Sequence, residues 1–151
     1  MIRWRRPRDD KSIVELVRSE LVPISPWQHP RDSRLHADIV RRMRRGATLV
    51  ASSTARGPVI GFLHMEFRHP EMLIDLLAVD SRYQNRKLGT ELMLQAERYA
   101  RNKGFAAARV FVDEENVRGI RFYRRLGYTR LREFPALKIV EMAKSLTPYE
   151  Y

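Results

Sequence analysis

Hydrophobic residues in the first third of the chain recur mainly at the three- and four-residue spacing of an amphipathic helix. Segment 2–5 alternates instead, which predicts a short strand. Either of two adjacent aspartates can cap the helix that follows, whose apolar positions are Ile13, Leu16, Val17 and Leu21. Three prolines predict a loop over 23–30, and a very basic second helix over 35–45 ends at Gly46.

The rest of the chain consists largely of strand-like runs. Two of them, 47–53 and 58–67, are joined by a hairpin signal, and a third contains a single carboxylate, Asp75. Further elements are expected as helix 88–103, strand 107–112, helix 115–126, strand 128–134 and strand 137–146. This order predicts an α/β fold with a mixed, mostly antiparallel sheet of about seven strands and about four helices. Segment 72–112 predicts a parallel crossover, and we expect a single domain over 1–151.

Charge and composition narrow the possible functions. The sequence has 29 Lys and Arg against 18 Asp and Glu, a net charge of +11, and no cysteine. The lack of cysteine excludes a disulfide scaffold, a thiolate metal site and a cysteine nucleophile, and the histidines show no metal-ligand spacing, so we expect no metal. No apolar run approaches the about 20 residues of a membrane span, and the N-terminal residues lack a signal-peptide core. We therefore expect a cytoplasmic protein that attracts anions and does not contact a membrane.

The turn after the third apolar run is the most informative segment. It has the sequence DSRYQNRKLGT over 80–90, and it follows a strand and opens a helix. The first N–H groups of a helix lack partners within the helix and lie at the positive end of its dipole, so they can bind a diphosphate. Arg82, Arg86 and Lys87 add positive charge, and Gly89 permits close approach of a ligand. The alternative is an ordinary strand–helix turn with solvated basic side chains.

Two blocks of the sequence resemble signatures of the GNAT superfamily of N-acetyltransferases. Segment 84–89, QNRKLG, resembles its Gln/Arg-x-x-Gly-x-Gly/Ala motif, with Lys87 at the place of the first glycine. Segment 116–128, NVRGIRFYRRLGY, is similar to its Asn-x-x-Ala-x-x-Phe-Tyr-x-x-x-Gly-Phe signature, with Gly119 at the place of alanine. The blocks occur in the family's order and separation. The resemblance implies a GNAT-like sheet whose central parallel strands splay apart.

The resemblance also implies an activity and a cofactor site. Members of the superfamily transfer an acetyl group from acetyl-coenzyme A to an amine by direct attack, without an acyl-enzyme. By similarity, the main chain of Leu77 and Val79 pairs with the pantetheine arm, and one of these amides polarises the thioester carbonyl. The expected cofactor-binding residues are Leu77, Ala78, Val79, Gln84, Asn85, Arg86, Lys87, Leu88, Gly89, Thr90, Asn116 and Tyr123.

The sequence also offers one candidate acid and several candidate bases. Tyr123 occupies the position that usually donates a proton to the leaving coenzyme A thiolate; the alternative is a core aromatic residue. Asp75 lies near the place where enzymes resembling polyamine and aminoglycoside acetyltransferases carry an acid. It is either the base that deprotonates the amine or a carboxylate paired with an arginine. Glu66 and His64 on the preceding strand can reach the same cleft, with exposed strand residues as the alternative, and Glu141 is a further candidate.

The acceptor is expected to be a primary amine of a small molecule, protein or peptide. Trp27, in the proline-rich loop, either walls the acceptor site together with Asp75 or anchors its own loop. Two other functions stay open: a basic nucleic-acid-binding module, and a non-catalytic regulator that binds coenzyme A. The arginines of segment 35–45 support the module, but no zinc finger, RNA-binding aromatic motif or basic-region heptad is present, so nucleic acid is the less favoured partner. We expect a monomer or a homodimer.

Overall fold

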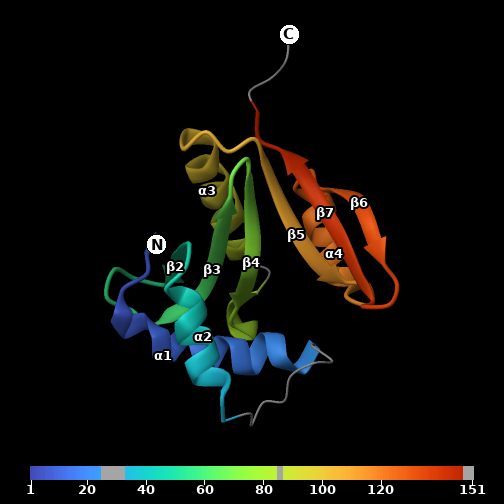
Figure 1. Cartoon of the computed structure of the whole chain (residues 1–151). Helices are drawn as coiled ribbons and strands as arrows, with labels where there is room; N and C mark the ends of the chain where they lie inside the picture. The colour runs from blue at the N-terminus through green and yellow to red at the C-terminus, as the bar shows by residue number, and fades with distance from the viewer. Residues whose placement is uncertain (25–32, 85–86, 148–151) are drawn as a thin grey trace. The chain divides into compact units, whose positions relative to one another are not determined.

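The computed structural model describes residues 1–24, 33–84 and 87–147. Three of the predicted site residues, Trp27, Asn85 and Arg86, lie outside the described residues. The strands form a seven-stranded sheet in the order β1-β2-β3-β4-β5-β7-β6 (Figure 1). The strands are β1 (Ile2–Trp4), β2 (Ala47–Ser52), β3 (Val59–Arg68), β4 (Glu71–Val79), β5 (Ala107–Asp113), β6 (Thr129–Phe134) and β7 (Ile139–Ser145).

Strand pairing confirms the predicted mixed and mostly antiparallel sheet. β4 and β5 are parallel, whereas β1–β2, β2–β3, β5–β7 and β6–β7 are antiparallel. The β4–β5 ladder joins residues 71–74 to residues 107–110, so the paired stretch is shorter than either strand. Asp75 is the first residue of β4 beyond this ladder.

Among the described residues, four α-helices accompany the sheet, at the places that the hydrophobic spacing predicts. They are α1 (Asp10–Leu16), α2 (Leu35–Met43), α3 (Leu88–Asn102) and α4 (Val117–Arg125). The three glycines expected to end helices, Gly46, Gly104 and Gly127, have φ of 68°, 87° and 99°. This left-handed conformation terminates a helix with little strain only when the residue lacks a Cβ. No helix among the described residues has the length and hydropathy needed to cross a membrane.

The first helix differs from its prediction. It was expected to continue as an α-helix to Leu21, but α1 ends at Leu16 and the chain continues as a π-helical turn over Val17–Leu21. The Val22 N–H accordingly donates to the carbonyl of Val17, one residue further back than in an α-helix. The wider turn buries Val22, which is 2% exposed, and leaves Leu21 only partly buried.

The chain comprises two compact units. One consists of Met1–Met65 and Leu76–Ala96, and the other of Glu66–Asp75 and Glu97–Tyr151. In the first unit, apolar residues of α1, α2 and the turns after α1 pack against Val50, Phe62 and Ala78 of the strands. The helical residues of this cluster are Ile13, Val14, Leu16, Val17, Val22, Leu35, Ile39 and Met43.

In the second unit, β5 and β7 supply buried residues to the core. On β5, Ala108, Val110 and Val112 are at most 4% exposed, whereas Phe111 between them is 47% exposed. This period-2 pattern means that one face of β5 carries the core of the unit. On β7, Val140 and Met142 are buried, and so is Glu141 between them.

Candidate active site

The turn between β4 and α3 belongs to the first unit and is held by several hydrogen bonds. The Asp80 N–H donates to the carbonyl of Ile60 at 2.8 Å, and the Gln84 side-chain amide donates to the carbonyl of Val79 at 3.0 Å. The Ser81 N–H donates to the Glu20 carboxylate at 2.9 Å. Glu20 was missed in the sequence because the contact joins residues 61 positions apart, and no local pattern indicates it.

Arg82 does not present a free charge in this turn. Its guanidinium donates to both carboxylate oxygens of Asp80, at 3.1 and 2.9 Å, and its backbone N–H donates to one of them. These hydrogen bonds from Arg82 lower the pKa of the Asp80 carboxyl. The Asp80–Arg82 pair is neutral overall. Lys87 is the other basic side chain of this turn that the structure describes, and it forms no ion pair with a described residue.

Lys87, at the position of the first glycine of the family motif, adopts a left-handed backbone conformation, which favours glycine. Its φ is 61°, its side chain is exposed, and its carbonyl accepts the N–H of Glu91 at 3.0 Å in the first turn of α3. Leu88, Gly89 and Thr90 then form the first residues of that helix. The turn therefore has a geometry that favours glycine although a lysine occupies the position.

A pair of variants at position 87 tests this conformation. Lys87→Gly and Lys87→Ala remove the same charge, but alanine keeps a Cβ at a positive φ. We expect the glycine variant to be more stable than the alanine variant by about 1 kcal/mol, because a Cβ is strained in the left-handed region. Urea unfolding of both variants measures the difference. An alanine variant of equal or greater stability would show that position 87 is not left-handed in solution.

Asn116, in the second unit, caps α4. Its side-chain oxygen accepts the N–H of Gly119 at 2.9 Å. A Cβ on residue 119 would lie 2.5 Å from the Asn116 amide nitrogen, so the glycine leaves room for this side chain. Position 119, where the family signature has alanine, is thus a glycine beneath the Asn116 side chain that caps the helix. This Asn116 side chain is also the one that the resemblance implies as a cofactor contact.

Tyr123 lies on the buried side of α4 and is 9% exposed. Its ring packs edge-on against Phe122 and Tyr128, with centroid distances of 5.1 and 5.7 Å. Burial raises the pKa of Tyr123, so the phenol keeps its proton at neutral pH. The structure therefore gives Tyr123 the protonation state that an acid requires, within an aromatic cluster.

A buried polar network beside this cluster was missed in the sequence. Glu97 of α3 is 2% exposed and accepts the Tyr128 hydroxyl at 2.8 Å and the Lys144 ammonium at 2.7 Å. Burial and the neighbouring Glu97 carboxylate raise the pKa of Tyr128. One feature of the sequence could have indicated this network: Glu97 lies between Ala96 and Ala100, two inward-facing positions of α3. Because the acid has two partners, this network supports the aromatic cluster around Tyr123.

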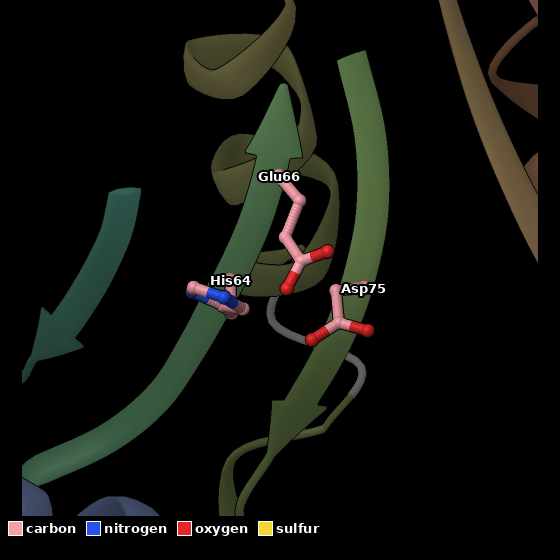
Figure 2. Close-up of side chains that lie close together, drawn as sticks. All are labelled: His64, Glu66 and Asp75. Atoms are coloured by element: carbon pink, nitrogen blue, oxygen red, sulfur yellow. The ribbon is translucent and has the colours of Figure 1, made fainter. Parts of the chain in front are cut away.

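Glu66 and Asp75 are brought together by β3 and β4. Figure 2 shows the Glu66 side chain directed along β3 towards the Asp75 carboxylate. His64 lies two residues before Glu66 on the same strand, and one potential ligand atom from each of the three lies within 4.8 Å of the others. Imidazole and carboxylate groups occur in both proton-transfer sites and metal sites.

His64 is fully buried and neutral. Its Nδ1 lies 2.7 Å from the Thr48 hydroxyl. Burial lowers its pKa to about 4, and the positive charges of Arg42, Arg45 and Arg5 act in the same direction. The imidazole therefore carries no charge at neutral pH, which is the form that accepts hydrogen bonds or protons.

Acid sensitivity follows from this histidine. In the unfolded chain His64 binds a proton below about pH 6.5, whereas in the folded chain it does so only near a pKa of about 4. The unfolded state thus binds more protons in this window, and stability falls as pH drops through it, by on the order of 2 kcal/mol. Unfolding of the wild type and His64→Gln between pH 7 and 4.5 measures this. The variant should lose less stability over that range; an identical loss would contradict the assignment.

Glu141, the further candidate base, has a different environment. It is fully buried, and its carboxylate forms ion pairs with Arg109 and Arg132, each at 3.1 Å. Arg109 also pairs with Glu71. The charge of Glu141 is matched by two guanidinium groups on neighbouring strands. This arrangement supports a structural role for Glu141 in the sheet.

Comparison with known proteins adds independent information. The model of the Acetyltransferase (GNAT) family matches residues 11–128. The spermidine N(1)-acetyltransferase of Thermoplasma acidophilum is 27% identical over 107 residues, covering 70% of this chain and 66% of that protein. The spore coat polysaccharide biosynthesis protein SpsD of Bacillus subtilis is 26% identical over 129 residues, covering 82% of this chain and 45% of that protein. The chain thus spans about half to two thirds of the length of these relatives.

The fold is shared with solved structures at low sequence identity. The PaiA N-acetyltransferase of Thermoplasma acidophilum, solved in complex with coenzyme A, superposes with a TM-score of 0.76 and 21% identity. The match covers 96% of this chain and 99% of that one. This similarity includes the seven-stranded sheet and the four helices.

Proposed function

Because the chain belongs to the GNAT acetyltransferase family, we propose that it is an N-acetyltransferase that moves the acetyl group of acetyl-coenzyme A directly to a primary amine. The observation that carries this proposal is the backbone of Lys87. Its φ of 61° lies in the left-handed region that favours glycine, at the position where the family's diphosphate motif has glycine. Two similar proteins are named spermidine N(1)-acetyltransferase and mycothiol acetyltransferase, which supports the same reaction class.

The diphosphate of the cofactor is proposed to bind at the turn that opens α3. The backbone N–H groups of the first turn, from Leu88 to Thr90, supply the donors, and the Lys87 ammonium adds a charge. Gln84 braces the turn through the Val79 carbonyl, and we expect the backbone of Leu77 and Val79 to bind the pantetheine arm. Ala78, Asn85, Arg86 and Asn116 complete the proposed set.

Proton transfer is assigned to the second unit. Asp75 takes one proton from the ammonium form of the acceptor, so that the nitrogen can attack the thioester carbonyl and the carbon–sulfur bond can break. Tyr123 gives a proton to the departing sulfur and regains one from the nitrogen that has become an amide. Glu66 helps to hold the ammonium. One tetrahedral nitrogen that donates two hydrogen bonds of about 2.8 Å reaches two acceptors about 4.6 Å apart. One oxygen of Glu66 and one of Asp75 lie within 4.8 Å of each other, so a single ammonium group can donate to both.

A panel of amines tests the proposed reaction. Spermidine, an aminoglycoside, a simple alkylamine and a peptide with a free N-terminus are each incubated with acetyl-coenzyme A, and the free thiol is measured. We expect thiol release that depends on at least one amine, with equal amounts of N-acetylated product by mass spectrometry. Tight binding of acetyl-coenzyme A by calorimetry with no thiol release from any amine would favour the regulator instead.

We further propose that the reaction takes place in the cytoplasm, on the basis of the cysteine-free composition. The acceptor is a primary amine. Trp27 and residues near Asp75 are proposed to contact the rest of the acceptor molecule and so to determine which amine is bound. The protein is expected to act as a monomer or a homodimer.

A further inference from the structure

Helix α4 carries a concentrated and unmatched positive charge. Arg118, Arg121, Arg124 and Arg125 are all exposed on a helix of nine residues that contains no acidic residue. None of the four forms an ion pair with any residue that the structure describes. Glu114 and Glu115 precede the helix, and within the described part of the chain their carboxylates form no ion pair with it either.

These four arginines share one face of the helix. At about 100° per residue they lie within about 120° of its circumference, and they extend about 10 Å along its axis. The buried residues Ile120 and Tyr123 are on the other side of the helix. Val117, which is 53% exposed, is the large apolar side chain on the arginine face. We call Arg118, Arg121, Arg124 and Arg125 the α4 arginine face.

This arrangement weakens the isolated helix. Arg118 and Arg121, Arg121 and Arg124, and Arg121 and Arg125 are like-charged pairs at spacings of three or four residues, and each pair costs a few tenths of a kcal/mol. Arg118 also stands in the first turn, where the helix dipole disfavours a cation. The other α-helices contain acids: α1 has Asp10 and Glu15, α2 has Asp38, and α3 has Glu91 and Glu97. The unmatched charge of α4 is therefore not a general property of the helices.

The chemistry of the face indicates its partner. A stable protein–protein interface needs an apolar, well-packed centre, and this face offers only Val117 for that purpose. Interfaces with nucleic acids are polar and strongly positive, and the planar guanidinium group binds phosphate oxygens through two parallel hydrogen bonds. We propose that the α4 arginine face binds the phosphate backbone of a nucleic acid. None of these four arginines is among the residues assigned to acetyl transfer, and the test of this proposal does not depend on catalysis.

Fluorescence anisotropy with a labelled 20-nucleotide single-stranded RNA tests the proposal. In one variant the four arginines of the face become glutamine. In the control variant Arg8, Arg44, Arg56 and Arg68, all exposed, become glutamine, so the two variants have the same net charge. We expect the face variant to lose more than tenfold in affinity and the control less than threefold. The slope of log affinity against log salt should fall by about 3 in the face variant only, since about 0.7 is lost per phosphate contact.

Further arms decide between the possible anions. A variant with lysine at all four positions should keep the salt dependence, because it keeps the four charges. Thermal unfolding of each variant checks that a loss of affinity does not come from loss of the fold. Equal losses in the face and control variants would overturn the proposal in favour of net charge alone. Equal affinity for poly-L-glutamate would assign the face to an acidic protein. Complete displacement of the RNA by coenzyme A would assign it to the cofactor.

Discussion

Replacing Tyr123 by phenylalanine is expected to reduce kcat by about 100-fold or more while the Kd for acetyl-coenzyme A stays within about twofold. The ring keeps its packing against Phe122 and Tyr128, so the change removes only the hydroxyl. Without it, the leaving sulfur departs as an unprotonated thiolate. Burial raises the pKa of Tyr123, and the wild-type phenol therefore holds its proton for this step. Steady-state kinetics with an active amine, together with calorimetry, measure the two quantities.

Tyr128→Phe is the matched control for this experiment. It removes the same atom from the neighbouring buried tyrosine, whose hydroxyl donates to Glu97 at 2.8 Å. We expect it to lower the free energy of unfolding by about 1–3 kcal/mol, because a buried charged acceptor loses a partner, with kcat near that of the wild type. If Tyr123→Phe behaves like this control, with unchanged kcat and lower stability, then Tyr123 is a core aromatic residue.

Replacing Asp75 by asparagine is expected to reduce kcat/KM for an amine by about 100-fold at neutral pH. Asparagine is nearly isosteric but cannot take the ammonium proton. The deficit should shrink as the pH approaches about 10, where an alkylamine loses its proton to solvent without help. The measurement is kcat/KM against pH for the wild type and the variant with the same amine.

Glu66→Gln separates the roles of the two carboxylates. Glu66 and Asp75 lie close together, but Glu66 is assigned to binding the ammonium. We expect a loss of about tenfold that is seen mainly in KM and depends weakly on pH. The two roles would be exchanged if Glu66→Gln showed the larger, pH-dependent loss of kcat/KM and Asp75→Asn kept wild-type activity.

Much of the fold follows from the hydrophobic pattern. The strands and helices of the described residues could be predicted because the long elements have clear hydrophobic spacing, and because Gly46, Gly104 and Gly127 follow the helices α2, α3 and α4. The first helix was predicted less well. The apolar spacing of Val17 and Leu21 is compatible with an α-helix, and nothing local indicates that a π-helical turn buries Val22 instead.

The candidate site could be predicted only where a local motif exists. The position of Lys87 at the first glycine of the family motif could be read from the sequence, whereas its positive φ of 61° is a finding of the structure. The contacts of Glu97 with Tyr128 and Lys144, and of Glu20 with Ser81, join residues far apart in the sequence, so no spacing rule finds them. The Asp80–Arg82 pair is local in the sequence. A count of the basic residues in the turn includes Arg82 but not the acid two residues before it, which neutralises its charge.

The central claim is that the acetyl group passes directly from acetyl-coenzyme A to an amine bound by this chain. A rapid-quench experiment with acetyl-labelled cofactor tests it most directly, with the amine added either at the start or after a delay. We predict no thiol release and no labelled protein before the amine is present, followed by labelled N-acetyl product when it is added. Release of one thiol per protein molecule before the amine arrives, together with label attached to the chain, would contradict direct transfer.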